Sequence, residues 1–225
     1  MVSLVSITRK SKAYCIGLGL MLLYLTASAG NKDTARGAGD FSLGMRNTTS
    51  AFTDAGSVGM GAGGEFRIRL AKHINTEWFA DYIGTDIQHL GYRRDGHIGW
   101  SVLFYLDKDP LTVGKITPYV LAGHCFDYTK VFSEWPGINP AERWSSAVQA
   151  GFGIHYNITN RCDVSLLAQY MLHLGTHIET NEPMDIITGQ TYLNIYKESG
   201  LSLEGHLLIT LSVNYCLGHL WGKKQ

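Results

Sequence analysis

Two long rows of alternating apolar and polar residues lie between Trp144 and Leu174, on either side of a short polar segment. In the first arm, most even-numbered positions up to Tyr156 are apolar, and the positions between them carry mainly small or polar residues. In the second arm, the even-numbered positions from Val164 onward are again apolar. A period of two is typical of a β-strand with two chemically different faces. The pattern therefore predicts a β-hairpin that turns at residues 157–161.

The length of each arm indicates where the hairpin lies. A tilted strand needs about 9 to 11 residues to cross a bilayer, whereas strands of soluble proteins usually have about 5 to 6. Both arms are long enough to cross a bilayer, and one face of each arm is mainly apolar. The hairpin therefore predicts two strands that span a membrane with the apolar face toward lipid.

Six further segments alternate with the same period and complete a set of about eight strands. The faces of the segment that begins at Ile116 are less clear, so its inward-facing parity stays open. The sequence predicts an all-β fold, namely an antiparallel up-and-down transmembrane β-barrel of about eight strands. The six predicted segments are Asp40–Arg46, Val58–Leu70, Glu77–Thr85, Ile98–Leu106, Ile116–Tyr128 and Leu201–Tyr215.

The connections between these strands have unequal lengths. Longer connections alternate along the chain with shorter polar turns, and outer-membrane barrels have short periplasmic turns and longer outer loops. The alternation predicts that both termini are periplasmic. The longer connections are residues 47–57, 86–96, 129–142 and 178–199.

Aromatic residues are expected at both ends of membrane-spanning strands, at the level of the lipid head groups. The positions predicted near the outer ends are Trp100 and Trp144, and those predicted near the inner ends are Trp78, Tyr156 and Tyr215.

The first 29 residues have the features of a secretory signal peptide. Three basic residues precede an apolar run from Tyr14 to Leu25, and Ala27-Ser28-Ala29 forms a small-residue cleavage site. The run is shorter than the ~20 residues of a membrane helix. We therefore expect residues 1–29 to be a signal peptide, residues 30–225 to be one barrel domain, and the protein to reside in the bacterial outer membrane.

The composition agrees with a barrel. Charged residues make up only 17% of the chain, below the ~25% of soluble domains, and 26 residues are glycine. Cleavage after Ala29 removes three basic residues and no acidic ones, so 16 basic residues face 19 acidic ones in the mature chain. An acidic excess gives no reason to expect a nucleic-acid partner.

Two short motifs accompany the alternating strands: Pro118-Tyr119-Val120-Leu121-Ala122-Gly123 at the start of one strand and Ala150-Gly151-Phe152-Gly153 within another. With the signal peptide and the strand pattern, they resemble the small bacterial outer-membrane β-barrel family over about residues 40–217. The chain is similar in architecture to the transmembrane domain of outer-membrane protein A. The resemblance implies contact with outer-membrane lipid and lipopolysaccharide.

Charged residues fall on the inward rows, and the lumen of a barrel of about eight strands is just wide enough for side chains to fill. Charges in such a core must pair. We expect Arg67 and Arg69 to meet Glu77 or Asp81. Closure of the first strand on the last is expected to bring Arg46 near Glu204, so that the barrel is plugged. The inward charges are Arg46, Glu65, Arg67, Arg69, Glu77, Asp81 and Glu204.

Three cysteines remain after signal cleavage, an odd number that does not form a self-contained disulfide framework. Cys162 and Cys216 are both expected near the periplasmic edge, but the alternation places their side chains on opposite faces of the sheet. The sequence therefore favours free thiols, although a β-bulge is able to bring the pair together.

The sequence contains few motifs for catalysis or metal binding. The nine histidines show no H-E-x-x-H or paired Cys/His spacing, and the His-x-Ser pair of a lipid-hydrolysing barrel does not occur. Residues 59–64 fit a G-x-G-x-x-G pattern, but an alternating strand follows where a dinucleotide site needs a helix. We expect no catalytic, cofactor or metal site.

One catalytic alternative stays open, because serines and histidines share the predicted inward rows. A serine and a histidine from neighbouring strands, oriented by an acid, are the set that a hydrolase needs. Polar inward rows are also what any small barrel requires. The residues concerned are Ser145, Ser165, Ser212, His155, His173 and His206.

These observations favour a non-enzymatic integral outer-membrane β-barrel protein that is a structural or accessory subunit of an outer-membrane complex for secretion, assembly or uptake. Its expected partners are outer-membrane lipid, lipopolysaccharide, and outer-membrane or periplasmic proteins. The alternatives are a small-solute or ion channel and a lipid-modifying barrel enzyme. The segment with Phe132 and Trp135-Pro136 is a binding tip for a partner, or a loop that is folded over the barrel rim or lies on the lipid head groups.

Overall fold

The computed structural model describes residues 36–52, 58–197 and 202–221. The predicted signal peptide lies outside these residues. Eight antiparallel strands close into a barrel, which confirms the all-β fold expected from the sequence. The barrel strands are β1 (Asp40–Phe52), β2 (Val58–Ala71), β3 (Ile74–Ile87), β4 (Gly91–Tyr105), β5 (Ile116–Ser133), β6 (Ala141–Asn157), β7 (Cys162–Gly175) and β10 (Ser202–His219).

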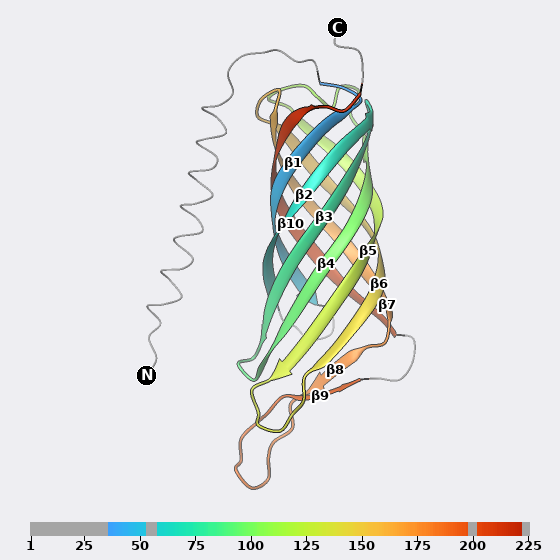
Figure 1. Cartoon of the computed structure of the whole chain (residues 1–225). Helices are drawn as coiled ribbons and strands as arrows, with labels where there is room; N and C mark the ends of the chain where they lie inside the picture. Colours follow the sequence, from blue (N-terminus) through green and yellow to red (C-terminus); the bar gives the residue numbers. More distant parts are fainter. Residues whose placement is uncertain (1–35, 53–57, 198–201, 222–225) are drawn as a thin grey trace, which may run out of the picture. The chain divides into compact units, whose positions relative to one another are not determined.

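The barrel strands pair in chain order, and β10 pairs with both β7 and β1 to close the cylinder (Figure 1). Between β7 and β10, the short strands β8 (Ile178–Asn181) and β9 (Asn194–Lys197) form a separate two-stranded hairpin. This hairpin lies at the end of the barrel opposite to the start of β1 and the end of β10 (Figure 1). We call these two ends the hairpin end and the terminal end. Within the described residues, no helix has the length and apolar character to cross a membrane.

Side chains alternate between the two faces of the barrel as the sequence predicts. The inward rows are buried, and the outward rows are mainly apolar and exposed. The barrel strands have 13 to 18 residues, more than the ~9 to 11 that a tilted membrane strand needs. An apolar belt on all eight strands is too extensive for a surface in water, so it faces lipid. It includes Leu43, Phe66, Trp78, Ile98, Phe126, Phe152, Leu166 and Leu211.

The first strand is longer than predicted. Residues 47–52 belong to β1, so the expectation of a loop is wrong for them. Thr48 and Ser50 are buried in the lumen, where Thr48 Oγ1 lies 3.0 Å from Thr210 Oγ1. On the outward side, Asn47 Nδ2 donates to the Gly61 carbonyl at 2.9 Å. Because the interior of this barrel is polar, a polar run fits a strand here and does not mark a loop.

The connection between β3 and β4 is shorter than predicted. The strands are joined by residues 88–90 alone, so the prediction of a long loop over residues 86–96 is wrong. Gln88 and His89 have φ angles of 51° and 60°, and the Asp86 carboxylate accepts the His89 N–H at 2.7 Å. Two successive left-handed residues form a tight turn that lets both strands continue to the rim.

The predicted alternation of loop lengths holds only in part. The connections at the terminal end are residues 72–73, 106–115 and 158–161, and the second of these is long. The described connections at the hairpin end are residues 88–90, 134–140 and the segment after β7 that contains the β8–β9 hairpin, whereas residues 53–57 and 198–201 lie outside the described residues. The longest connection is therefore where the sequence predicts it. The periplasmic location of the termini stays a prediction.

Aromatic residues form a row on the outside of the terminal half of the barrel. Phe66 stacks on Trp78 with 5.9 Å between ring centroids, and Trp78 contacts Trp100 at 6.2 Å. The prediction of Trp100 near the opposite strand end is wrong, because β4 begins earlier than expected and Trp100 is opposite Trp78 in the β3–β4 ladder. Trp144 lies toward the hairpin end, 4.8 Å from the Tyr128 ring. Aromatic residues at both levels are typical of membrane interfaces.

Gly153, from the Ala150–Gly153 motif, provides a test of interior packing. A Cβ atom at this position would lie 2.4 Å from the Tyr119 ring and hydroxyl. Tyr119 is fully buried, and its hydroxyl lies 2.8 Å from Ser165 Oγ, so the ring has little room to move. We expect Gly153→Ala to lower the free energy of unfolding by about 1–3 kcal/mol, measured by urea titration in lipid vesicles.

Gly64→Ala is the matched control. The atom nearest to a Cβ at Gly64 lies 3.7 Å away, which is an ordinary contact, and the added methyl group faces outward. We expect this variant to be as stable as the wild type. Equal losses in the two variants would contradict the packing of Tyr119 over Gly153.

Candidate functional site in the barrel interior

The barrel interior contains layers of buried side chains. Charged and hydroxyl-bearing residues surround two apolar clusters. Because a lumen of this width is filled by side chains, its chemistry depends on how the polar groups pair. One apolar cluster consists of Phe79, Ile83, Cys125, Ala147, Met171 and Leu208, and the other of Leu103, Tyr105, Tyr119, Leu121 and Leu167.

Arg46 is the centre of an ion network formed by β1, β2 and β3. Its guanidinium group lies 3.3 Å from Glu65, 3.1 Å from Glu77 and 3.1 Å from Asp81. The guanidinium carbon also lies 4.3 Å from the centroid of the Phe79 ring. The Arg46 side chain is 0% exposed, so it contacts three carboxylates without access to water.

Arg67 extends this network across the lumen to β7. Its guanidinium group lies 2.7 Å from Glu65, 2.9 Å from Glu77 and 3.0 Å from Asp163. The predicted contact between Arg67 and Glu77 is therefore confirmed. Arg69 instead donates to a backbone carbonyl of the β2–β3 turn at 3.0 Å. The guanidinium groups thus join strands that are not neighbours in the barrel wall.

A second ion cluster lies toward the hairpin end. Glu204 lies 2.7 Å from Arg93 and also pairs with Arg143 and His177. The prediction that Arg46 lies near Glu204 is wrong. The β1–β10 ladder ends at Phe52 and His206, so its register places Arg46 and Glu204 at different levels of the barrel.

Three histidines and one aspartate form a further buried cluster. Asp127 Oδ1 lies 2.9 Å from His97 Nε2, and Asp127 Oδ2 lies 3.2 Å from His173 Nδ1. His173 Nε2 lies 2.9 Å from His206 Nε2, and His206 Nδ1 lies 3.1 Å from Ser50 Oγ. The histidines and the aspartate are at most 1% exposed. The cluster lies beside the Arg46 network, since His97 is opposite a carboxylate of that network in the β3–β4 ladder.

Ser145, His173 and Asp127 come together, but their geometry differs from that of a hydrolase triad. Ser145 Oγ lies 3.3 Å from His173 Nδ1, and Asp127 Oδ2 lies 3.2 Å from the same nitrogen. In a triad, the serine and the acid contact opposite nitrogens of the imidazole, which lets the ring accept the serine proton. Here Ser145 donates to Asp127 at 3.1 Å. The three groups satisfy one another and are not arranged to activate a nucleophile.

The other serines and histidines of the predicted inward rows have different contacts. Ser165 and His155 are opposite each other in the β6–β7 ladder. Ser165 lies 2.8 Å from the Tyr119 hydroxyl, and the His155 ring packs on the Tyr119 ring with 4.5 Å between centroids. Ser212 accepts a hydrogen bond from Arg67 at 3.2 Å. The structure thus assigns these residues to packing and to the ion network.

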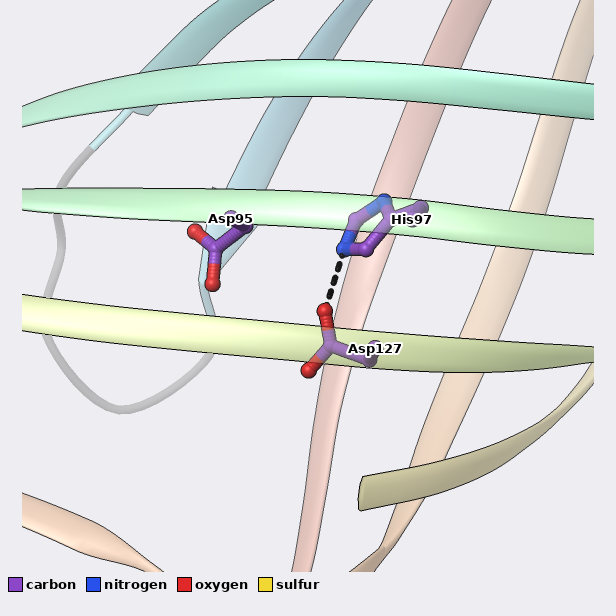
Figure 2. A group of neighbouring side chains, drawn as sticks. All are labelled: Asp95, His97 and Asp127. Carbon is purple, nitrogen blue, oxygen red and sulfur yellow. Dashed lines mark ion pairs between the residues drawn. The ribbon is translucent and has the colours of Figure 1, made fainter. Parts of the chain in front are cut away.

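Figure 2 shows a group that the sequence analysis missed, with Asp95 and His97 on β4 and Asp127 on β5. All three residues are buried, and one ligand atom from each lies within 4.8 Å of the others. The available signal was the Asp-x-His spacing, which places two ligands on one face of a strand. It was missed because residues 86–96 had the composition of a loop and because the parity of β5 was open.

The cysteines of the described chain are free. Cys125, Cys162 and Cys216 are all buried. Cys162 is opposite Tyr215 in the β7–β10 ladder, so Cys216 is one residue further along β10 and points to the other face. This placement agrees with the predicted lack of a disulfide.

Comparisons with known proteins show the fold. No known protein family and no curated protein matches the chain. The chain is similar in structure to Neisserial surface protein A, with 12% sequence identity, a TM-score of 0.52, and coverage of 81% of this chain and 99% of that one. The N-terminal β-barrel domain of Pseudomonas aeruginosa OprF has 13% identity and a TM-score of 0.47, with coverage of 80% and 100%. Ail, the attachment invasion locus protein of Yersinia pestis, has 13% identity and a TM-score of 0.47, with coverage of 79% and 98%.

The fold and the apolar belt together determine where the protein resides. The first of these structures shares the closed barrel, and the outward rows of this chain form a surface that requires lipid. The chain is therefore an integral β-barrel protein of the bacterial outer membrane.

Replacement of Arg46 tests the ion network. Arg46→Met keeps much of the side-chain volume but removes the cation that Asp81 contacts in the lumen. Loss of one partner from a buried ion pair costs about 3–5 kcal/mol, because the other charge stays buried. We expect a loss of this size in the free energy of unfolding, measured by urea titration in lipid vesicles.

Lys72→Met is the matched control. Lys72 pairs with Asp109 at 2.7 Å, but the two side chains are 57% and 67% exposed. Exposed pairs contribute at most about 1 kcal/mol. If Arg46→Met were no more destabilising than Lys72→Met, the Arg46 network would not be a buried charge core.

Proposed function

We propose that the protein is a non-enzymatic accessory subunit of an outer-membrane complex and that it binds its protein partner through the β8–β9 hairpin. The observation that carries the proposal is the apolar tip of this hairpin. Ile186 and Ile187 are 100% and 95% exposed, and Met184 is 66% exposed. An exposed apolar cluster beyond the barrel wall is typical of a protein interaction site.

The tip is held in a defined turn. The Asp185 carboxylate accepts the backbone N–H of Ile187 at 2.8 Å and that of Thr188 at 2.7 Å, and the Asp185 N–H donates to the Gln190 carbonyl at 2.9 Å. The Thr188 N–H and hydroxyl hold the pKa of Asp185 below its ordinary value. The carboxylate contacts are therefore present at neutral pH and are lost as the pH falls through this lowered pKa.

The base of the hairpin packs on the barrel rim. Ile178 of β8 and Leu193 are 5% and 0% exposed, and they pack against the ends of β3 and β5. Trp135, in the segment that the sequence analysis singled out, stacks on Tyr192 with 5.1 Å between ring centroids. A hairpin anchored in this way loses less conformational freedom on binding than a flexible loop does.

The filled interior supports an accessory role and argues against a channel. The side chains of Arg46, Arg67 and Glu77 are at most 3% exposed, although they lie in the lumen. Charged groups that select ions in a pore line a path for water and ions. A channel would require these ion pairs to separate.

The position of the serine and histidine residues supports a non-enzymatic role. Ser145 and His173 are 8% and 1% exposed, and both point into the lumen. A lipid substrate approaches the outside of the barrel, so an acyl group does not reach these side chains. The proposed activity is therefore binding alone.

The proposal orients the hairpin end toward the outside of the cell, with both termini in the periplasm. Gly189 is suited to a tag insertion, because it is exposed in the turn at the tip of the hairpin. We expect antibody to label a tag at Gly189 on intact cells, and a tag after Gln225 only after the outer membrane is opened. The reverse labelling would contradict the orientation.

A double substitution at the hairpin tip tests partner binding. Burial of one isoleucine is worth about 1.5–3 kcal/mol, and about 1.4 kcal/mol is tenfold in affinity. We expect the wild-type protein, purified in mild detergent, to retain a stoichiometric protein partner. Ile186→Ser with Ile187→Ser should reduce the recovery of that partner by at least about tenfold.

Val113→Ser is the matched control for this experiment. Val113 is 45% exposed in the connection between β4 and β5 at the terminal end, so its replacement leaves the hairpin unchanged. This variant should retain the partner. Absence of a partner from the wild-type preparation, or full retention by the double variant, would contradict the proposal.

A further inference from the structure

The barrel interior holds more buried carboxylates than guanidinium groups. A buried carboxylate without a compensating positive charge is strongly unfavourable. The eight buried carboxylates of the described chain belong to Asp40, Glu65, Glu77, Asp81, Asp95, Asp127, Asp163 and Glu204. The six arginines whose side chains enter the interior are Arg36, Arg46, Arg67, Arg69, Arg93 and Arg143. With neutral histidines, the interior is therefore short of two positive charges.

The contacts of Asp127 show where the shortage lies. Asp127 Oδ2 accepts a hydrogen bond from Ser145 Oγ at 3.1 Å, and it lies 3.1 Å from Thr129 Oγ1 and 3.2 Å from His173 Nδ1. Asp127 Oδ1 faces His97 Nε2. Two hydroxyl groups and two imidazoles thus hold this carboxylate, and none of them carries a fixed positive charge.

His97 and Asp127 face each other as a buried ion pair whose atoms are not aligned as a hydrogen bond (Figure 2). His97 Nε2 and Asp127 Oδ1 lie 2.9 Å apart, but neither atom makes an aligned hydrogen bond within the described residues. Both residues are 0% exposed. Buried polar atoms nearly always have a partner, and one explanation for such an exception is an ion between them. Asp95 supplies a third ligand atom within 4.8 Å.

We propose that His97, Asp127 and Asp95 bind a divalent transition-metal ion of the Zn²⁺ class. Zn²⁺ lies about 2.0–2.2 Å from imidazole nitrogen and carboxylate oxygen, so two ligand atoms of one tetrahedral ion are roughly 3.4 Å apart. His97 Nε2 and Asp127 Oδ1 are 2.9 Å apart, so a shift of only about 0.5 Å brings them to this spacing. The ion also supplies positive charge beside Asp127, whose hydroxyl and imidazole contacts carry no fixed positive charge. A site with three protein ligands leaves a coordination position for water.

Neighbouring side chains already orient the ligands. Thr129 Oγ1 donates to Asp95 Oδ1 at 2.7 Å, and Arg93 Nε donates to the same oxygen at 3.0 Å. Ser145 holds the oxygen of Asp127 that points away from His97. Hydrogen bonds of this kind fix the orientation of metal ligands and are part of a built metal site.

The remaining histidines of the cluster are satisfied without an added proton. In one consistent assignment, Ser50 donates to His206 Nδ1, His206 Nε2–H donates to His173 Nε2, and His173 Nδ1–H donates to Asp127. Both imidazoles are neutral in this chain of hydrogen bonds. His97 is not part of this series of hydrogen bonds, and the proposed ion would be its partner. The site joins β4 to β5 and is independent of the hairpin surface.

Metal content tests this site. The full barrel is refolded with excess Zn²⁺ and passed through a desalting column. It should retain about one Zn²⁺ per chain, measured by inductively coupled plasma mass spectrometry. Co²⁺ in its place should give visible absorption bands. His97→Gln and Asp127→Asn should each weaken Zn²⁺ binding by at least about 100-fold, since loss of an outer partner alone costs about 10–100-fold.

His155→Gln is the control, because His155 is another buried lumen histidine and packs on Tyr119 away from the site. It should bind Zn²⁺ as the wild type does. If the His97→Gln variant does not fold, the Asp127→Asn variant tests the site by itself, because asparagine keeps the shape of the aspartate side chain. Lack of retained Zn²⁺ and of Co²⁺ bands in the wild type would overturn the site and assign the missing charge to protonated histidine. Equal retention by the wild type and both ligand variants would also overturn it, because the ion would then bind elsewhere.

Discussion

A lumen too narrow for bulk water makes its charged side chains depend on one another, and the rest of this barrel is built around that pairing. Arg46 and Arg67 share Glu65 and Glu77, and Arg67 reaches Asp163 on the far wall. The ladders between neighbouring strands close the cylinder, and these ion pairs tie strands together through its centre. Removal of any one partner leaves a charge in a medium of low dielectric constant, so the network is stable only as a whole.

The same constraint explains the inverted distribution of side chains. The apolar outward rows are stable in contact with lipid and do not need to be buried inside the protein. The hydrophobic effect therefore does not stabilise this barrel in the way that it stabilises the core of a soluble protein. Interior packing and backbone pairing take its place. Glycine contributes where a bulky group needs space, as Gly153 does beneath the Tyr119 ring. At the hairpin end the pattern changes, since Ile186 and Ile187 are exposed on a segment that projects beyond the barrel rim.

The sequence predicted the elements whose two faces differ most. The segment Val58–Leu70 alternates apolar residues with glycine and charged residues, and β2 covers Val58–Ala71. Prediction failed in residues 47–52, where both faces of the strand carry polar residues. With a polar outward residue such as Asn47, the segment has no alternation of apolar and polar positions that would identify it as a strand. Contacts across the lumen were harder still. They depend on register, and the register of β4 follows from the left-handed turn at Gln88 and His89, which composition alone does not indicate. The His97 and Asp127 pair was missed for this reason.

Electrical recording in planar lipid bilayers tests the closed lumen most directly. Protein whose folded state is verified by heat-modifiable migration on gels is inserted into the bilayer, and its conductance is recorded at moderate voltage and salt. The account predicts no stable conductance steps, because a continuous water path requires the Arg46 and Arg67 ion pairs to separate. Large, stable steps from the wild-type barrel would contradict it and would show that water and ions pass where the structure places buried charge.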